Sequence, residues 1–491
     1  MKKWKEKAFL CMAVCCCLGA QNAVLASESE NTQDENYKVT AITEVFGDGQ
    51  KVSAVALEYP GEIDAESLSA DDYEVEGKRI TQVFTNSEAG ITDGNVPGNY
   101  VILNLEYENS ESPDAMNQKA GRENRDISDD TSFEGNEPEK GEKPDGRMNG
   151  ETPPDGENGE MGRGGGNKGE GMGPDGGNVD GGMLRGVEGA DGKSADLSVA
   201  VIQKGEVMAA DGTVYEGTGN AVKSSDQIDL IVQDFQQLEY TDPETGNTIP
   251  YSLYLPEGYD ESKEYPLLFF VADASANGDD ITRNLTQGNG ATIWATTGEQ
   301  EKHECIILSP QYTNTLIDSI GALTTDENVW SDGLTLVSSL LHYVIDEYSV
   351  DVTRIYGTGQ SQGCMTNIAL SDKYPDLFAA QLLVAGQWDV EEMAAMKDKN
   401  LWIVVCEGDN KAYPGMNEAT EKWESLGSAV ARSDMWDSTS TAEEFDELVS
   451  QMESQNCKIN YTVFEGGSHT YTWTVAYNIE GIRDWLFAQT I

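Results

Sequence analysis

The sequence predicts an α/β protein in which a doubly wound, mainly parallel sheet follows a smaller antiparallel β-sandwich. Three observations support this prediction. Short β-type runs separated by turn residues fill residues 37–108, a long Gly-rich acidic tract follows, and apolar strands alternate with amphipathic helices from residue 246 onward. At 491 residues the chain is also too long for a single hydrophobic core, so two folded units are expected.

The β-sandwich is expected to extend over residues 37–235. Its first strands are predicted at three runs rich in Val, Ile and Leu: 39–42, 52–57 and 100–105. Similar runs resume at 197–202 and 228–232. We interpret these as the closing strands of the same sandwich, with the Gly-rich tract as an insertion. The alternative is that they begin a separate small unit.

The inserted tract, residues 109–195, consists mainly of Gly, Glu, Asp, Asn and Pro. Such a composition buries too little apolar surface to offset the entropy cost of ordering the chain, so the insertion is predicted to be disordered. The phrase at 174–177, Pro-Asp-Gly-Gly, superficially resembles a calcium-binding repeat, but it does not recur with a fixed period.

Residues 1–26 have the features of a secretory signal peptide. Several lysines precede an apolar run at 8–20, and Val-Leu-Ala at 24–26 forms a cleavage site before Ser27. The run is shorter than the roughly 20 residues that span a bilayer. We therefore expect a secreted protein with no membrane insertion after cleavage, an uncleaved anchor being the alternative.

The overall charge limits the possible partners. The chain has 87 acidic against 32 basic residues, a formal net charge of −55. A surface this negative repels phosphate backbones and anionic lipids, so neither nucleic acid nor a membrane surface is expected as a partner.

Four cysteines follow the predicted signal peptide: Cys305, Cys364, Cys406 and Cys457. Their wide spacing does not resemble a disulfide framework, and none has the spacing of a zinc site. Because Cys305 and Cys406 border apolar runs, buried free thiols are the favoured interpretation.

The second unit, residues 246–491, alternates strands with helices. The helix predicted around 337–348 places apolar side chains at helical spacing, and a final helix is expected from 475 to 489. The predicted strands are apolar or β-branched runs that parallel sheets bury on both faces, and they lie at 265–271, 305–308, 352–356, 381–384, 401–406 and 459–464.

The motif Gly359-Gln-Ser361-Gln-Gly363 directly follows one of these strands and precedes a helical stretch. A nucleophile elbow has this placement, because the serine occupies a strained turn and the glycines let strand and helix approach each other. The sequence thus predicts Ser361 as a catalytic nucleophile.

A serine nucleophile needs a base, and the chain has only three histidines. His303 precedes the serine in the chain, and His342 lies off the apolar stripe of its helix. His469 follows the last predicted strand within Gly-Gly-Ser-His, so we predict that it is the base.

The third member of a triad is an acid that orients the histidine. Asp409 follows the strand at 401–406 and is the predicted acid, and Glu407, two residues earlier, is the alternative.

An oxyanion hole is also required. The backbone N–H of Gln362 is one expected donor, and the loop around Asp273 and Ala274, after the strand at 265–271, is expected to supply the second. This loop lacks the His-Gly-Gly pattern of many esterases, and Asp273 could instead simply cap a turn.

These motifs resemble those of known families. Residues 246–491 are similar to the feruloyl-esterase and polyhydroxybutyrate-depolymerase-like branch of the α/β-hydrolases, also labelled predicted peptidases. The resemblance rests on Tyr-Ser-Leu-Tyr-Leu-Pro at 251–256, Arg-Ile-Tyr-Gly-Thr-Gly-Gln-Ser at 354–361 and His-Thr-Tyr-Thr-Trp at 469–473. Residues 37–104 resemble the immunoglobulin-like (Ig-like) domain that precedes some bacterial secreted esterases.

The resemblance implies a serine esterase that forms an acyl-enzyme on small-molecule or polysaccharide-linked esters, without a metal or organic cofactor. A serine peptidase and a non-catalytic glycan-binding protein are the alternatives. Residues 411–456 are expected to form a helical flap. A few aromatic side chains are expected near the site, where one or two would touch substrate: Trp388, Tyr413, Trp423, Trp436 and Trp473.

Overall fold

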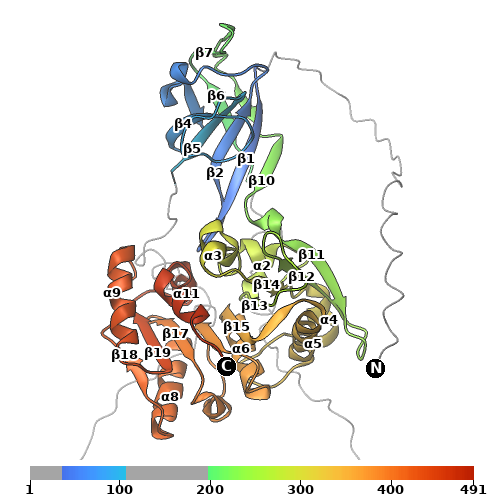
Figure 1. Ribbon diagram of the computed structural model, residues 1–491, viewed down its shortest axis with the longest axis vertical. Coiled ribbons are helices and arrows are strands. Elements are labelled where there is room, and N and C mark those ends of the chain that lie inside the picture. Colours follow the sequence, from blue (N-terminus) through green and yellow to red (C-terminus); the bar gives the residue numbers. More distant parts are fainter. Residues whose placement is uncertain (1–35, 107–196) are drawn as a thin grey trace, which may run out of the picture.

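The computed structural model describes residues 36–106 and 197–491. Figure 1 shows a β-sandwich above a larger α/β domain, joined by one continuous passage of the chain. The predicted signal peptide, 1–26, and the predicted disordered insertion, 109–195, both lie outside the described residues.

The first domain is an Ig-like sandwich of a five-stranded sheet, in the order β10-β1-β2-β5-β4, and a three-stranded sheet, in the order β3-β6-β9. A short hairpin, β7-β8, is attached to them. The strand bounds are β1 Lys38–Phe46, β2 Gly49–Glu58, β3 Tyr73–Val75, β4 Ile80–Asn86, β5 Tyr100–Leu105, β6 Ala200–Gln203, β7 Val207–Met208, β8 Val214–Tyr215, β9 Ala221–Lys223 and β10 Asp226–Asp229.

The strands on the two sides of the undescribed tract pair with one another. β6 pairs with β3, and β10 pairs with β1. Alternate residues of the large sheet, such as Val55 and Leu103, pack against Val75 and Val201 of the small sheet. The strands on the two sides of the undescribed tract therefore pack in one sandwich.

The second domain is built on a nine-stranded sheet in the order β11-β12-β14-β13-β15-β16-β17-β19-β18. β11 and β12 are antiparallel to their neighbours, and the strands from β14 to β18 are parallel. The strand bounds are β11 Gln236–Thr241, β12 Thr248–Tyr254, β13 Tyr265–Val271, β14 Ile306–Pro310, β15 Val350–Gln360, β16 Ala380–Val384, β17 Leu401–Cys406, β18 Val430–Arg432 and β19 Ile459–Phe464.

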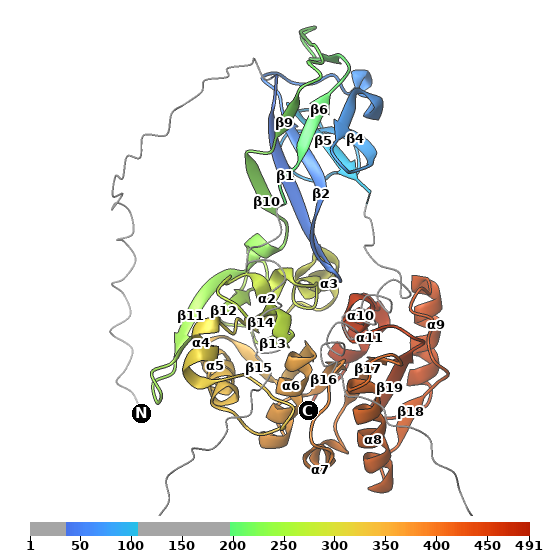
Figure 2. The same ribbon diagram turned by 180° about the vertical axis from the view of Figure 1, so that it is seen from behind.

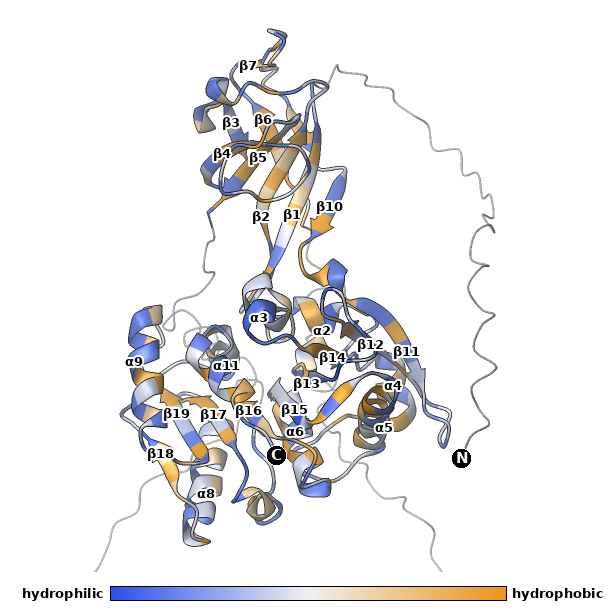
Figure 3. Ribbon diagram, viewed as in Figure 1, coloured by the Kyte–Doolittle hydropathy of each residue, from blue (hydrophilic) through white to orange (hydrophobic). Residues whose placement is uncertain are grey.

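Helices cover both faces of this sheet because the strands bury apolar side chains on both sides. Leu267 and Phe269 of β13 face the cluster that contains α5, α6 and α8, and Leu268 and Phe270 face the cluster that contains α9 and α11. The helix bounds are α2 Arg283–Thr286, α3 Thr297–Lys302, α4 Asn314–Ile320, α5 Asp332–Glu347, α6 Gln362–Lys373, α7 Val390–Met393, α8 Ala412–Ser425, α9 Ala442–Glu453, α10 Tyr471–Ala476 and α11 Glu480–Phe487. Figure 3 shows hydrophobic residues concentrated on the strands and hydrophilic residues on outer elements such as α3.

The final helix differs from the prediction. It is broken into α10 and α11, with Ile479 in an extended conformation between them. Side chains bind the carbonyls that the break leaves free: Asn478 donates to the Thr474 carbonyl and Arg483 donates to the Tyr477 carbonyl. The break is thus stabilised by local polar contacts that helical periodicity does not reveal.

Residues 411–456 also differ from the expected flap. They form α8, the edge strand β18 and α9, which extend and cover the sheet. Trp423 of α8 and Met452 of α9 are fully buried in the two core clusters, so this segment is part of the domain's framework.

The chain leaves the sandwich at the end of β10. Leu230 packs in the sandwich, whereas Val232 and Phe235 pack in a core cluster of the second domain. Between them Ile231 has a φ of 66°, which turns the backbone. This turn ends the strand at Asp229, earlier than the predicted 228–232 run.

Two further features concern the length of the helices and the state of the cysteines. Within residues 36–106 and 197–491, no helix is long and apolar enough to cross a bilayer. Cys305, Cys364 and Cys406 are buried free thiols, and Cys457 is a half-buried one. Burial raises the pKa of the Cys305 and Cys406 thiols to about 12, which keeps both protonated at neutral pH.

Candidate active site

Ser361 stands on a strained turn between β15 and α6. Its φ of 51° and ψ of −116° lie in a region that side-chain-bearing residues rarely adopt. The glycines on either side allow this turn. A Cβ on Gly359 would lie 2.6 Å from the Val271 carbonyl oxygen, and one on Gly363 would lie 1.7 Å from the same atom. The elbow therefore depends on two glycines against which β13 packs closely.

The structure brings Ser361, His469 and Asp409 together. His469 Nε2 lies 2.8 Å from Ser361 Oγ, and His469 Nδ1 lies 2.5 Å from Asp409 Oδ2. The three residues follow β15, β19 and β17, whose carboxyl ends meet at one edge of the sheet. In parallel sheets this edge is where ligands bind.

Asp409 is held as a carboxylate. Burial alone raises its pKa, but the hydrogen bond and the charge interaction with His469 and the N–H groups of Ala412 and Lys411 outweigh it and hold the pKa of Asp409 below its ordinary value. An ionised carboxylate only accepts hydrogen bonds, so His469 Nδ1 must donate the one they share. His469 Nε2 then carries the lone pair that faces the Ser361 hydroxyl.

Glu407, the alternative acid, has a different task. Its carboxylate accepts a hydrogen bond from the backbone N–H of Gly466, and its own N–H donates to the Phe464 carbonyl. These contacts fasten the turn after β19. A Cβ on Gly467 would lie 2.6 Å from Cys406 Sγ, so this turn lies directly on β17. Glu407 therefore anchors the loop that presents His469.

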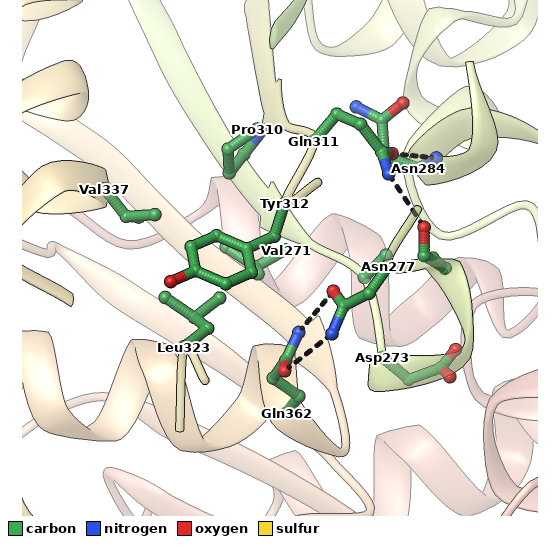
Figure 4. Close-up of a pocket in the computed structure, with 12 residues that line it drawn as sticks. Val271, Asp273, Asn277, Asn284, Pro310, Gln311, Tyr312, Leu323, Val337 and Gln362 are labelled. Carbon is green, nitrogen blue, oxygen red and sulfur yellow. Dashed lines mark hydrogen bonds between the residues drawn. The ribbon is translucent and has the colours of Figure 1, made fainter. Parts of the chain in front are cut away.

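The loop after β13 is tied to the start of α6 by a pair of side-chain amides. Asn277 Nδ2 donates to Gln362 Oε1 at 3.2 Å, and Gln362 Nε2 donates to Asn277 Oδ1 at 3.0 Å. Gln311 Nε2 donates to the Ala276 and Gly278 carbonyls. Figure 4 shows this buried network. The cavity that it lines measures about 10 Å³, which is no more than one water molecule requires.

The predicted oxyanion donors lie at these two places. Gln362 is the first residue of α6, and Ala274 is the first of the short 3-10 turn Ala274–Ala276. Neither N–H has an acceptor within its own helix. The Asp273 side chain caps this turn by accepting from Ser275 N–H at 2.7 Å. The Asp273 side chain thus caps a turn, which was the alternative interpretation of this residue. Only backbone N–H groups of this loop are left to contribute to an oxyanion hole.

Of the five singled-out aromatic residues, Trp473 has a ring contact with the triad, and Tyr413 donates its backbone N–H to the Asp409 carbonyl at 3.3 Å. Trp473 meets the His469 ring edge to face, with centroids 5.3 Å apart. Trp388 donates to Glu392, Trp423 to the Met393 carbonyl and Trp436 to Ser433. Tyr413 packs partly buried against a core cluster. These four residues are framework residues.

Sequence reasoning missed the polar residues around the elbow. Gln360 Nε2 donates to Gln287 Oε1 at 2.8 Å and lies 3.3 Å from Asp273 Oδ2. These two contacts connect the end of β15, next to Ser361, to the loop after β13 and to the segment after α2. Asn277 and Gln311 hold the β13 loop in the same way. No local motif distinguishes these amides from other Asn and Gln residues; only their position next to a recognised motif could have indicated them.

The sheet topology and the triad define the class of the protein: an α/β-hydrolase fold preceded by an Ig-like domain. Residues 38–216 match the family described as the esterase Ig-like N-terminal domain. The solved structure of a thermostable esterase superposes with a TM-score of 0.65 and 24% identity, covering 92% of this chain and 100% of that one. The predicted fold and the N-terminal resemblance are confirmed.

Curated relatives match a shorter segment. Feruloyl esterase B of Talaromyces stipitatus is 32% identical over 105 residues, 21% of this chain and 28% of that protein. Acetylxylan esterase A of Emericella nidulans is 30% identical over 88 residues, 18% of this chain and 29% of that protein. The chain thus spans less than a third of the length of these two relatives.

Proposed function

We propose that this protein is a serine carboxylic-ester hydrolase that works through an acyl-enzyme, with Ser361, His469 and Asp409 as its triad. The observation that carries the proposal is the unbroken hydrogen-bonded chain from Ser361 Oγ through both ring nitrogens of His469 to the buried Asp409 carboxylate. The names of the esterase relatives support the reaction class.

In the first half-reaction, Ser361 Oγ attacks the ester carbonyl carbon while its proton passes to His469 Nε2. The carbonyl oxygen becomes an oxyanion, which the N–H of Gln362 and an N–H of the Asp273–Ala274 segment would stabilise. The positive end of the α6 dipole adds to this effect. The tetrahedral carbon then expels the alcohol, which takes the proton from Nε2, and leaves an ester on Ser361.

The second half-reaction repeats these steps with water. His469 Nε2 removes a proton from water as the water oxygen attacks the acyl carbon, and returns it to Ser361 Oγ as the acid leaves. Asp409 stays ionised throughout and stabilises the imidazolium that forms twice per turnover. No residue outside the triad needs to change its charge.

The substrate class is inferred from the relatives. The compared enzymes include a feruloyl esterase and an acetylxylan esterase, so we infer an aromatic or acetyl ester linked to carbohydrate. Action on such a polymer agrees with the secretion that the first residues of the sequence predict.

Hydrolysis of p-nitrophenyl acetate, methyl ferulate and acetylated xylan by the wild type and Ser361→Ala tests this proposal. Ser319→Ala, on the exposed side of α4, is a matched control. We expect hydrolysis of at least one ester, lost in Ser361→Ala and retained in Ser319→Ala. Equal activity in Ser361→Ala would refute the serine mechanism. Cleavage of peptide anilides in place of esters would favour a peptidase, and no reaction with a fluorophosphonate probe would favour a binding protein.

A further inference from the structure

The β1–β2 hairpin of the Ig-like domain projects from the sandwich, and its tip reaches the α/β domain. Figures 1 and 2 both show it extending from the sandwich to the region of α3. Val45, near the end of β1, packs against a core cluster of the α/β domain. The tip is therefore part of the Ig-like domain in sequence, but it contacts the α/β domain.

The contact at the tip is made by backbone atoms. A Cβ on Gly47 would lie 2.4 Å from the Thr474 carbonyl oxygen and 2.7 Å from its Cα. On the other side, a Cβ on Gly288 would lie 3.1 Å from the Gly47 carbonyl oxygen. Backbone cannot change rotamer to relieve such contacts, so the tip fits tightly between α10 and the segment that contains Gly288.

The two residues that pack against the tip, Thr474 and Gly288, are each next to a residue that contacts the triad or its immediate neighbour. Thr474 follows Trp473, which is 4% exposed and meets the His469 ring edge to face. A Cβ on Gly288 would lie 3.8 Å from Trp473 Cδ1 and 3.9 Å from Gln360 Nε2. Gln287, beside Gly288, accepts the Gln360 hydrogen bond next to Ser361. Two contacts thus link the tip to the base: the tip packs on Thr474, and the neighbouring Trp473 packs on His469. Two more link it to the residue before the nucleophile, because the tip packs on Gly288 and the neighbouring Gln287 binds Gln360.

We propose that the tip of the β1–β2 hairpin, residues 46–49, is a positioning element of the triad, which holds Trp473 against His469 and Gln287 against Gln360. The inference rests on the proposed function and extends it to the N-terminal domain. Proton transfer through His469 Nε2 depends on its distance and angle to Ser361 Oγ, and errors of about 1 Å can cost about 100-fold in rate. A displaced tip should therefore lower kcat more than it raises KM.

Gly47→Ala tests this role, because Gly47 is not among the glycines with positive φ and alanine adds only the clash with Thr474. Gly94→Ala is the matched control: it lies in a loop of the same domain, is also absent from the positive-φ set, and has no atom within 4 Å of its added Cβ. We expect kcat for p-nitrophenyl acetate to fall about tenfold or more in Gly47→Ala. Its KM should rise by a smaller factor than kcat falls, and the kinetics of Gly94→Ala should stay unchanged.

A second readout does not depend on activity. The chain has three histidines, so the ring resonances of His469 in an NMR spectrum can be assigned with His303→Gln and His342→Gln. We expect Gly47→Ala to shift the His469 resonances and leave those of the other two in place. A folded Gly47→Ala with unchanged kcat and unchanged His469 resonances would overturn the inference, as would equal losses of kcat in Gly94→Ala.

If Gly47→Ala does not fold, Gly288→Ala tests the same contact from the other side, where the added Cβ meets the Gly47 carbonyl less severely. It should give a smaller loss of kcat with a shift of the same His469 resonances, and no shift would overturn the inference. Failure of the proposed function has a different signature: the wild type itself would show no hydrolysis that depends on Ser361, and the NMR result would still decide the role of the hairpin.

Discussion

Two histidine–aspartate pairs in the α/β domain have nearly the same distance and different surroundings. His469 Nδ1 lies 2.5 Å from Asp409, and His303 Nε2 lies 2.7 Å from Asp484. The Asp409 side chain is 3% exposed, whereas that of Asp484 is 47% exposed. A short contact therefore says little by itself about what a pair can do.

The second side of each ring distinguishes the pairs further. The other ring nitrogen of His469, Nε2, lies 2.8 Å from the Ser361 hydroxyl oxygen. The His303 ring stacks on Phe487, with centroids 4.7 Å apart and planes 12° apart, and fastens the end of α3 to α11. The same two residue types thus form the proposed catalytic pair where a serine hydroxyl lies on the other ring nitrogen, and a packing contact where an aromatic ring covers the imidazole.

The largest difference is expected from removing each ring. His469→Gln should lower kcat/KM for p-nitrophenyl acetate by about 10⁴-fold or more, because the serine loses its base. His303→Gln should leave kcat/KM unchanged and lower only the melting temperature. Kinetics and thermal unfolding of both variants check this expectation. The distinction between the pairs breaks if the two variants lose activity to a similar extent.

Removal of the carboxylates should separate the pairs almost as clearly. Asp409→Asn should reduce kcat by about 10³–10⁴-fold, because the amide no longer fixes the tautomer or stabilises the imidazolium. Asp484→Asn should keep full activity. Glu407→Gln, two residues from Asp409, is the nearest control, since its amide oxygen can still accept from Gly466 N–H. A lower kcat in Glu407→Gln than in Asp409→Asn would identify Glu407 as the acid of the triad.

The sequence could indicate the three residues of the proposed triad because each follows a buried strand of a parallel sheet. Apolar runs before Ser361, Asp409 and His469 place their loops at one edge, and local turn chemistry identifies the elbow. Fold and candidate site were accessible for the same reason: both follow from periodicity and from motifs that occupy a few consecutive residues.

Contacts between distant segments were not accessible in this way. Gly47-Asp48-Gly49 predicts a tight turn, but nothing local indicates that its backbone packs on Thr474, more than 400 residues further on. Which of the five aromatic residues lies beside His469 could not be read from the sequence either, because only the fold places Trp473 there. The break between α10 and α11 depends on Asn478 and Arg483, whose partners are carbonyls that any helix has.

The smallest expected effect concerns stability and pH. The pKa of Asp409 in the folded protein lies below its ordinary value, so at moderate pH the ionised carboxylate stabilises the fold. This contribution is complete above the ordinary aspartate pKa of about 3.9 and is lost as pH falls through the lower pKa of the folded state, because the unfolded chain binds the proton first. Asp409→Asn lacks this contribution at every pH.

The free energies of unfolding of the wild type and Asp409→Asn should therefore differ above about pH 5 and converge in more acidic solution. Urea titrations followed by tryptophan fluorescence can measure this, because all tryptophans within the described residues belong to the α/β domain. The half-exposed Asp484 provides the comparison, since removing an exposed ion pair changes stability by no more than about 1 kcal/mol. The difference in free energy of unfolding between the wild type and Asp409→Asn could instead stay the same in acid. The folded state would then not stabilise the Asp409 carboxylate, and this distinction between the two pairs would be wrong.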